Sequence, residues 1–421
     1  MPHASQSDED DRARRSHHGV GDGDGDGPAP SSPGRLVPVT GHGVGEAELA
    51  AVARVLGSGG LTTGPETALF EKELAGHFGT GPVLAVNSCT AALHLALLCL
   101  GVGAGDEVIT SVLTFPATVN AVLAVGAVPV LVDVDPRTLN ISPAAVAAAV
   151  TPRTRAVVPI HMGGAACDMT ALRDIADRHS LPLVADAAHA VDTRTGGRHI
   201  AGEADVSCFS FYATKNLTSV EGGALTGPAE IVDRARLLAR HGLRFSWDPA
   251  LPATAASYEA VAAGWKYNLS DVHAAVGRTQ LARLPELQRA RRDVVRIYDD
   301  ALAGLPGVEL PHRTSTEEHS WYLYQIQLTA VSDGHGPDGH GPRDRVAERL
   351  RRAGIVTGSY YAPLSRNAFL ASVCRVPERP VHAEAVWQRL LALPVHPGVS
   401  AADARWIAAR LTAALAEEDQ G

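Results

Sequence analysis

Two charged residues follow buried-looking segments of the chain and could do chemistry together. Asp186 directly follows the apolar run Leu181–Ala185, and Lys215 lies just past the apolar run Val206–Phe211. An aspartate at the end of a buried strand could bind a metal, act as a general base or pair with a protonated ring nitrogen. A lysine there is unusual, because desolvation disfavours its charge and makes the neutral amine a nucleophile. The alternative is a surface lysine whose head group reaches water.

A third segment, Asn87-Ser88-Cys89-Thr90, follows the apolar run Val83–Val86 and leads directly into an Ala- and Leu-rich stretch. Hydroxyl groups and free backbone N–H groups at the start of a helix bind anions, and phosphate fits such a site. A simple N-cap without a ligand is the other interpretation.

One cofactor uses all three groups. Pyridoxal phosphate (PLP) needs a phosphate clamp, an aspartate for its pyridinium nitrogen and a lysine for its aldehyde. A dinucleotide is not expected, because the glycines of Gly101–Gly105 follow a helix-like segment and not a strand. We therefore expect a PLP site and no metal site.

The elements that must position these residues alternate between strands and helices. Strands are predicted at Val83–Val86, Glu107–Thr110, Val128–Val134, Ala156–Ile160, Leu181–Ala185 and Val206–Phe211. Helices are predicted at Ala91–Leu100, Ala117–Val125, Ala144–Val150 and Met169–His179. This alternation is typical of a largely parallel sheet with helices on both faces, which is a three-layer α/β domain.

The remainder of the chain is expected to differ. Residues 1–35 have the composition of a disordered tail, and residues 36–284 would form the large domain. A long Arg-rich helix is predicted at Pro285–Leu305 and a strand at Tyr322–Leu328, so residues 285–421 are expected to form a smaller α+β domain. The polar stretch 332–345 is predicted to be an inserted loop.

Composition excludes several classes of protein. The formal net charge is −9, so neither nucleic acid nor an anionic membrane is expected as a partner. Apolar residues make up 45% and charged residues 20%, which are ordinary globular values. Five cysteines without a CxxC pair favour a reducing compartment, and with no secretory or membrane-spanning segment we expect a cytoplasmic protein.

From about residue 37 to residue 415 the sequence resembles the DegT/DnrJ/EryC1/StrS sugar aminotransferases, which have PLP fold type I, like aspartate aminotransferase. The resemblance is carried by the motifs Gly60-Leu-Thr-Thr-Gly64, Asn87-Ser-Cys-Thr-Ala-Ala-Leu93, Gly105-Asp-Glu-Val108, Asp186-Ala-Ala-His-Ala190, Ser210-Phe-Tyr-Ala-Thr-Lys-Asn216, Glu221-Gly-Gly223 and Tyr267-Asn-Leu-Ser-Asp271. In its motifs the chain is most similar to the branch that makes UDP-4-amino-4-deoxy-L-arabinose.

The resemblance implies a role for each matching residue. Lys215 would be the Schiff-base lysine and Asp186 the partner of the pyridine nitrogen, while His189 would contact the phenolic oxygen and Phe115 would stack on the ring. The phosphate ligands would be Ser88, Thr90 and Ser210, with Cys89 standing where many members have glycine. Either Lys266 or, with slight preference, Asn268 would reach the phosphate of the neighbouring subunit, which implies a homodimer.

The resemblance also implies a reaction. The enzyme would move an amino group from L-glutamate to a keto carbon, C4 by preference, of a sugar linked to dTDP or UDP. Tyr360 and Ser365 stand where relatives often carry histidines, so the sugar pocket should differ. The Ala-, Arg- and Gly-rich composition is typical of a high-GC bacterium, in which such enzymes often serve antibiotic and other secondary metabolism.

Three alternatives remain. One is a 3-keto sugar aminotransferase of the same family. A sugar dehydratase is disfavoured, because histidine replaces the lysine in those enzymes and Lys215 is present. A non-catalytic PLP-binding regulator is disfavoured by that lysine and by the lack of a nucleic-acid-binding module.

Overall fold

The computed structural model describes residues 36–246, 257–313, 317–329 and 341–419. The predicted tail, residues 1–35, and most of the predicted loop at 332–345 lie outside these ranges. The predicted loop is too long at its C-terminal end, because residues 342–345 belong to the first turn of helix α9 (Pro342–Arg352). Proline is suited to this first helical position, since its missing N–H would have no helical partner there.

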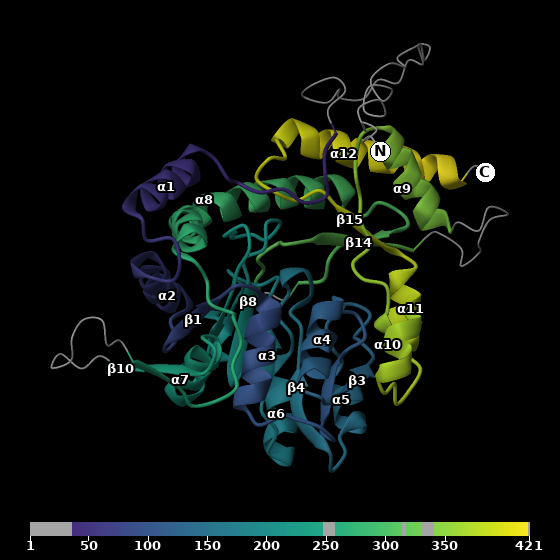
Figure 1. Ribbon diagram of the computed structural model, residues 1–421. Coiled ribbons are helices and arrows are strands. Elements are labelled where there is room, and N and C mark those ends of the chain that lie inside the picture. Colours follow the sequence, from purple (N-terminus) through teal and green to yellow (C-terminus); the bar gives the residue numbers. More distant parts are fainter. Residues whose placement is uncertain (1–35, 247–256, 314–316, 330–340, 420–421) are drawn as a thin grey trace, which may run out of the picture.

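The centre of the molecule is a seven-stranded sheet in the order β1-β9-β8-β5-β4-β2-β3 (Figure 1). Two sheets of regular pairing are joined where Val157 bridges Leu183 and Ile160 bridges Asp186, both in parallel. Every strand runs parallel to the others except β9, which is antiparallel to both neighbours. The strands are β1 Val83–Val86, β2 Glu107–Ser111, β3 Val128–Val132, β4 Thr154–Val158, β5 Val184–Asp186, β8 Val206–Ser210 and β9 Gly223–Thr226.

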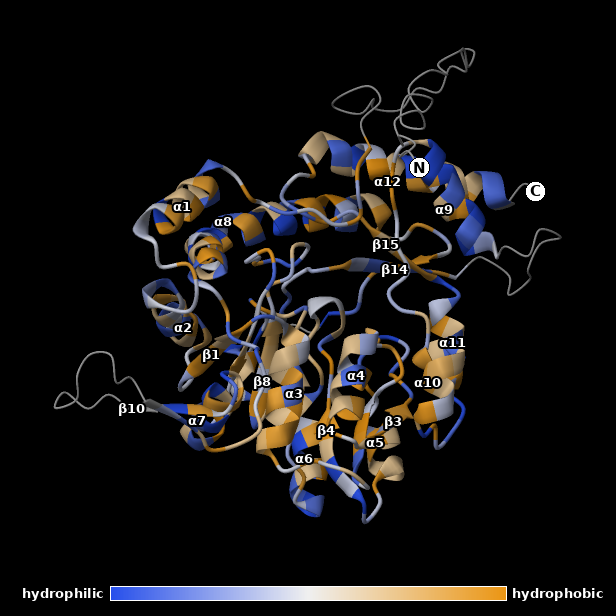
Figure 2. Cartoon of the chain, viewed as in Figure 1, coloured by the Kyte–Doolittle hydropathy of each residue, from blue (hydrophilic) through white to orange (hydrophobic). Residues whose placement is uncertain are grey.

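Helices cover both faces of this sheet, as the sequence predicts. Alternate strand residues face opposite sides, so that Leu84 and Cys208 belong to one apolar cluster with helix α3, whereas Val83 and Phe209 belong to another with α2. Figure 2 shows apolar residues gathered on α3 and on the strands beneath it. The helices that pack on the two faces of the sheet are α2 Pro65–Phe78, α3 Cys89–Cys99, α4 Pro116–Ala124, α5 Pro143–Ala149, α6 Met169–His179 and α7 Ala229–Leu238.

A second apolar core lies above the sheet in Figure 1, around the end of helix α8. Its antiparallel sheet has the order β12-β14-β15. Val37, from the start of the described chain, completes this core and bridges Ile355. Its elements are β12 Val308–Glu309, β14 Tyr324–Leu328, β15 Leu390–Leu393, α9 and α12 Ala401–Asp419.

Helix α8 runs without interruption from Asp271 to Leu302 and contains Pro285 in its interior. The prediction that a helix begins at Pro285 is therefore wrong, and the predicted boundary at 284/285 falls inside one helix. A proline is most common in a first turn, which explains the prediction. In the structure Leu284 packs in the core of the large sheet and Val294 in the upper core, so that α8 connects the two.

Residues after 285 do not all belong to the upper core. Leu370 and Val386 pack with Leu113, two residues past the end of β2, and with Leu131 of β3. Arg375 bridges Val130 of the same edge strand. The helices α10 (Ala368–Val373) and α11 (Val381–Trp387) accordingly lie beside β3 in Figure 1.

The remaining elements are α1 Glu46–Ser58, β6 Arg194–Thr195, β7 Arg198–His199, β10 Leu243–Ser246, β11 Ser257–Ala260, β13 Glu317–Glu318 and the short 3₁₀ turns Met162–Gly164, Ile200–Gly202 and Leu364–Arg366. Within the described residues, no helix combines the length and the apolar character needed to cross a membrane.

The carboxylate of Asp271 links two of the sequence motifs. Asp271 is the first residue of α8 and 2% exposed, yet its oxygens accept hydrogen bonds from the start of α2. The donors are the backbone N–H groups of Gly64 (2.8 Å), Glu66 (3.2 Å) and Thr67 (2.9 Å), and the Thr67 hydroxyl (2.7 Å). One side chain thus caps α2 while it starts α8, which holds both helices against the sheet.

We predict that Asp271→Ala lowers the free energy of unfolding by about 2–3 kcal/mol, because buried donors lose a charged acceptor. Urea unfolding of the purified protein measures this loss. Asp300→Ala, which removes an exposed carboxylate from the same helix, is the matched control and should change the value by less than about 0.5 kcal/mol. Equal effects of the two substitutions would contradict the capping role.

Candidate active site

Asp186 and Lys215 meet at one edge of the sheet because β5 and β8 are parallel neighbours. Asp186 is the last residue of β5 and pairs with Cys208 of β8. Lys215 follows β8 by five residues, in a turn closed by its own N–H to the Tyr212 carbonyl (2.9 Å). Its Nζ lies 4.1 Å from the centroid of the Tyr322 ring, which gives the ammonium a cation–π contact.

Tyr322 reaches this position through a buried hydrogen-bond network. The Asn216 side chain, next to Lys215, donates to the Ser320 carbonyl and to Gln288 of α8. The Ser320 hydroxyl donates to the His189 carbonyl (2.6 Å). These bonds attach the segment that carries Tyr322 to the sheet edge that carries Lys215.

The Asp186 carboxylate is buried and holds several donors. Its Oδ2 accepts a hydrogen bond from the Thr118 hydroxyl (2.7 Å), and its Oδ1 accepts one from the Ala188 N–H (3.1 Å). The Cys89 sulfur lies 3.9 Å from Oδ1. Burial raises the pKa of Asp186, while these donors and the charge of Lys215 act in the opposite direction. Such an environment suits a carboxylate that pairs with a buried cation.

His189 is also buried, and its protonation follows from its contacts. Burial, with the nearby charge of Lys215, holds the pKa of His189 well below its usual value, so the ring is neutral. Its Nδ1 accepts the Gly163 N–H (3.3 Å), which places the proton on Nε2. Nε2 lies 3.3 Å from the Tyr361 hydroxyl, and the ring stacks on Tyr322 with centroids 4.3 Å apart. His189 thus presents an Nε2–H donor.

The phosphate-binding candidates meet at the start of α3. Ser88 is its N-cap and accepts the Ala91 N–H (3.1 Å), as the simpler interpretation requires. Its own hydroxyl proton points to Asn87 Oδ1 at 3.4 Å, a long bond that a better acceptor such as a phosphate oxygen would replace. The N–H groups of Cys89 and Thr90 lie in the first turn, where helices supply no acceptor.

Strand β9 approaches this helix start closely. A Cβ on Gly223 would lie 2.5 Å from the Cys89 nitrogen, so only glycine fits there. Gly223 pairs with Ser210, the buried last residue of β8, so Ser210 lies near the start of α3. The donors fit a phosphate group, and together with Asp186 and Lys215 they fit PLP.

Two other predicted site residues, Cys89 and Phe115, differ in exposure: the first is buried and the second is exposed. Cys89 is a buried thiol, and burial with the Asp186 charge holds its pKa well above its usual value, so it remains protonated. Phe115 is the N-cap of α4 and 58% exposed, with its ring centroid 6.0 Å from that of Tyr361. It is therefore free to stack on a ligand.

Lys266 and Asn268 contact each other within this chain. The Lys266 ammonium donates to Asn268 Oδ1 (2.6 Å), and Asn268 Nδ2 donates to the Thr63 hydroxyl (2.6 Å). Asn268 bridges Val86, the last residue of β1, and so lies two residues from Ser88 along this edge.

Three residues that contact the site were not predicted from the sequence: Thr118, Tyr322 and Tyr361. Tyr322 and Tyr361 come from segments more than 100 residues after Lys215, and no spacing rule connects them. Thr118 had a weaker local signal, because it lies in the first turn of the predicted helix Ala117–Val125, three residues after Phe115.

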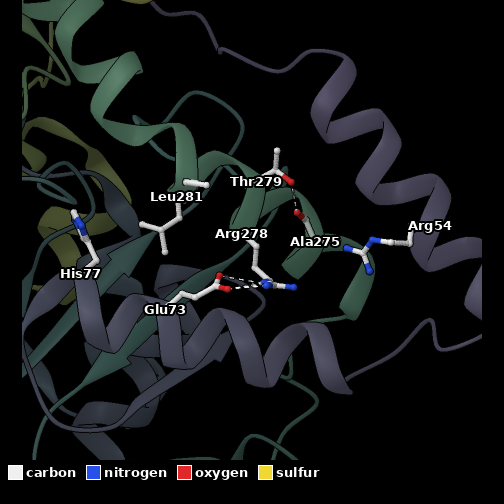
Figure 3. A pocket seen from close by; sticks show the side chains of 8 residues that line it. Arg54, Glu73, His77, Ala275, Arg278, Thr279 and Leu281 are labelled. Carbon is white, nitrogen blue, oxygen red and sulfur yellow. Dashed lines mark hydrogen bonds and ion pairs between the residues drawn. The ribbon is translucent and has the colours of Figure 1, made fainter.

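A cavity of about 520 Å³ lies elsewhere, between α1, α2 and α8 (Figure 3). Its lining includes Arg54, Glu73, His77 and Arg278, and none of the residues considered above. Arg278 forms ion pairs with Glu73 and Glu66, and Glu66 also pairs with Arg54, so these charges compensate one another. None of the candidate catalytic side chains at the sheet edge lines this cavity.

Comparison with known proteins identifies the family to which this chain belongs. The model of the DegT/DnrJ/EryC1/StrS aminotransferase family matches residues 43–412. The chain belongs to this family. The spore coat polysaccharide biosynthesis protein SpsC of Bacillus subtilis (strain 168) is 40% identical over 361 residues, which are 85% of this chain and 91% of that protein.

Solved structures agree with this family. The aminotransferase TlmJ from Streptoalloteichus hindustanus superimposes with a TM-score of 0.82 at 35% identity, covering 91% of this chain and 99% of that one. Spr1654 from Streptococcus pneumoniae, described as a sugar aminotransferase, gives 0.84 at 29% identity with the same coverage. It was solved in PLP and PMP (pyridoxamine phosphate) forms. The chain is thus a PLP-dependent sugar aminotransferase of fold type I.

We predict that Lys215→Ala loses at least about 10³-fold in turnover, because the amine that lies beside Asp186 to bind the cofactor's aldehyde and move the proton is removed. The protein should still fold, and PLP should wash out on dialysis, measured by its absorbance. Lys72→Ala removes an exposed lysine of α2 and should leave both properties unchanged. Turnover of Lys215→Ala within tenfold of the wild-type value would contradict the assignment.

Proposed function

We propose that the enzyme transfers an amino group from L-glutamate to the C4 keto group of a sugar carried on UDP or dTDP, in amino-sugar biosynthesis. The observation that carries this proposal is the meeting of Lys215, Asp186 and the start of α3 at one sheet edge. The preference for C4 rests on the motif resemblance, above all Trp265-Lys-Tyr-Asn-Leu-Ser-Asp271.

Each side chain then has a role that its contacts allow. When bound, the cofactor supplies an aldehyde that carries the amino group and a protonated ring that withdraws electrons. Lys215 Nζ would bind that aldehyde and later move a proton, and Asp186 would hold the proton on the ring nitrogen. His189 Nε2–H would donate to the phenolic oxygen, and Phe115 would cover the ring.

The phosphate would be held by groups at the start of α3. The hydroxyls of Ser88, Thr90 and Ser210 and the backbone N–H of Cys89 are its proposed donors, and the positive end of the helix favours the anion. The Cys89 side chain points toward Asp186, as the 3.9 Å distance shows, so it does not occupy the phosphate position.

The sugar would lie against the wall formed by residues 359–365. Tyr361 faces both Phe115 and His189, and Tyr360 packs edge to face on Tyr361 with ring centroids 5.4 Å apart. Two adjacent phenol rings leave less room than smaller side chains would. We therefore propose a compact substrate, a pentose or a 6-deoxyhexose.

We further propose a homodimer in the cytoplasm. The pair Lys266 and Asn268 lies at the edge that carries Ser88, and a two-fold axis would repeat its contact in both subunits. All five cysteines are free thiols, which supports a reducing compartment.

A panel of nucleotide-linked keto sugars tests the proposal. With L-glutamate as donor, we predict that kcat/KM is at least about tenfold higher for a 4-keto sugar than for its 3-keto isomer, since a misplaced carbonyl loses alignment with Lys215. UDP and dTDP forms of a pentose and a 6-deoxyhexose are compared by mass spectrometry of the products.

The possible outcomes separate the alternatives. A preference for the 3-keto isomer would replace the proposal with the 3-keto aminotransferase. A protein that binds PLP but transfers no amino group from glutamate or other donors to any panel member would favour the non-catalytic regulator.

A further inference from the structure

Behind the Asp186 carboxylate lies a pair of buried threonine hydroxyls with no role in the mechanism above. The Thr118 hydroxyl is 2.7 Å from Asp186 Oδ2, and the Thr114 hydroxyl is 2.8 Å from that of Thr118. Both threonines are 1% exposed. The three groups form a continuous chain from the start of α4 to the end of β5.

The charge of Asp186 sets the direction of these hydrogen bonds. An ionised carboxylate only accepts, so the single proton of the Thr118 hydroxyl must point at Oδ2. The Thr118 oxygen is then free to accept the proton of Thr114. A proton on Oδ2 of Asp186 would reverse the chain, and Thr114 would turn toward its weaker acceptor, the Phe115 carbonyl at 3.4 Å. The arrangement with shorter bonds is the one with the charge on Asp186.

The other groups around Asp186 do not replace these hydroxyls. Oδ1 accepts the Ala188 N–H and faces the Cys89 thiol, whereas Oδ2 has Thr118 as its donor among the described residues. A carboxylate offers about four acceptor positions. One position on Oδ2 is therefore open to a donor from a bound molecule. The ionisable groups that act on Asp186 are Lys215, Cys89, Cys208 and Tyr361.

We propose that Thr118, supported by Thr114, is a positioning residue that keeps the Asp186 carboxylate ionised and aims its Oδ2 at the ring nitrogen of PLP. The ring nitrogen and the carboxylate compete for one proton. A hydrogen bond to the carboxylate weakens its hold on that proton and leaves it on the ring, where it withdraws electrons. The inference depends on the cofactor and is independent of which sugar is the substrate.

The test loads the enzyme with PLP labelled with ¹⁵N in the ring and measures the ring nitrogen's chemical shift by NMR. In the wild-type protein and in Thr118→Ser, which keeps the hydroxyl, the shift should be that of a protonated ring. In Thr118→Val, which keeps the shape and loses the donor, it should move toward the unprotonated value, and PLP should bind about tenfold or more weakly.

Thr110→Val is the matched control. Thr110 is fully buried on β2, but its hydroxyl donates to the Val158 carbonyl (2.8 Å) and not to Asp186. This variant should lose stability without changing the ring-nitrogen shift. A folded Thr118→Val protein with the same shift as Thr110→Val would overturn the proposal.

A second variant keeps the test open if Thr118→Val does not fold. Thr114→Val leaves the Thr118 donor in place and removes the hydroxyl behind it. It should move the ring-nitrogen shift in the same direction by a smaller amount. An unchanged shift in this variant would equally overturn the proposal.

Discussion

The active site depends on one carboxylate that must carry a negative charge in the protein interior. Burial alone would favour the neutral form of Asp186, and an uncompensated buried charge is costly. The fold supplies the compensation through the Thr118 hydroxyl, the Ala188 N–H and the ammonium of Lys215. The same desolvation that makes the charge costly strengthens its interaction with a cation. A protonated pyridine ring is such a cation.

The sheet topology explains how these groups come together. Parallel β5 and β8 end at the same edge, which places Asp186 and Lys215 side by side, and the antiparallel β9 brings Gly223 against the start of α3. The chain beyond α8 then covers the site from above, because Tyr322 and Tyr361 pack over Lys215 and His189. The large sheet thus supplies the cofactor groups, and the later segments supply the wall that a substrate would meet.

The parts that sequence could predict are those fixed by local pattern. The runs before Asp186 and Lys215 predicted buried strands, and Ser88 before an Ala/Leu-rich stretch predicted a helix start; all three elements are present. Contacts between distant segments left no such pattern. Asn216 holds Tyr322 over Lys215 through Ser320, more than 100 residues away. The predicted helix start at Pro285 was wrong for a related reason, because packing against both apolar cores keeps α8 helical across this proline.

The most direct test of this account locates the cofactor on the chain. The sequence contains three lysines, Lys72, Lys215 and Lys266, so the site of attachment can be identified without ambiguity. The PLP-loaded enzyme is reduced with borohydride, digested and mapped by mass spectrometry. The account predicts one pyridoxyl group per chain, on Lys215. Attachment to Lys72 or Lys266, or recovery of unmodified Lys215 from fully loaded enzyme, would contradict it.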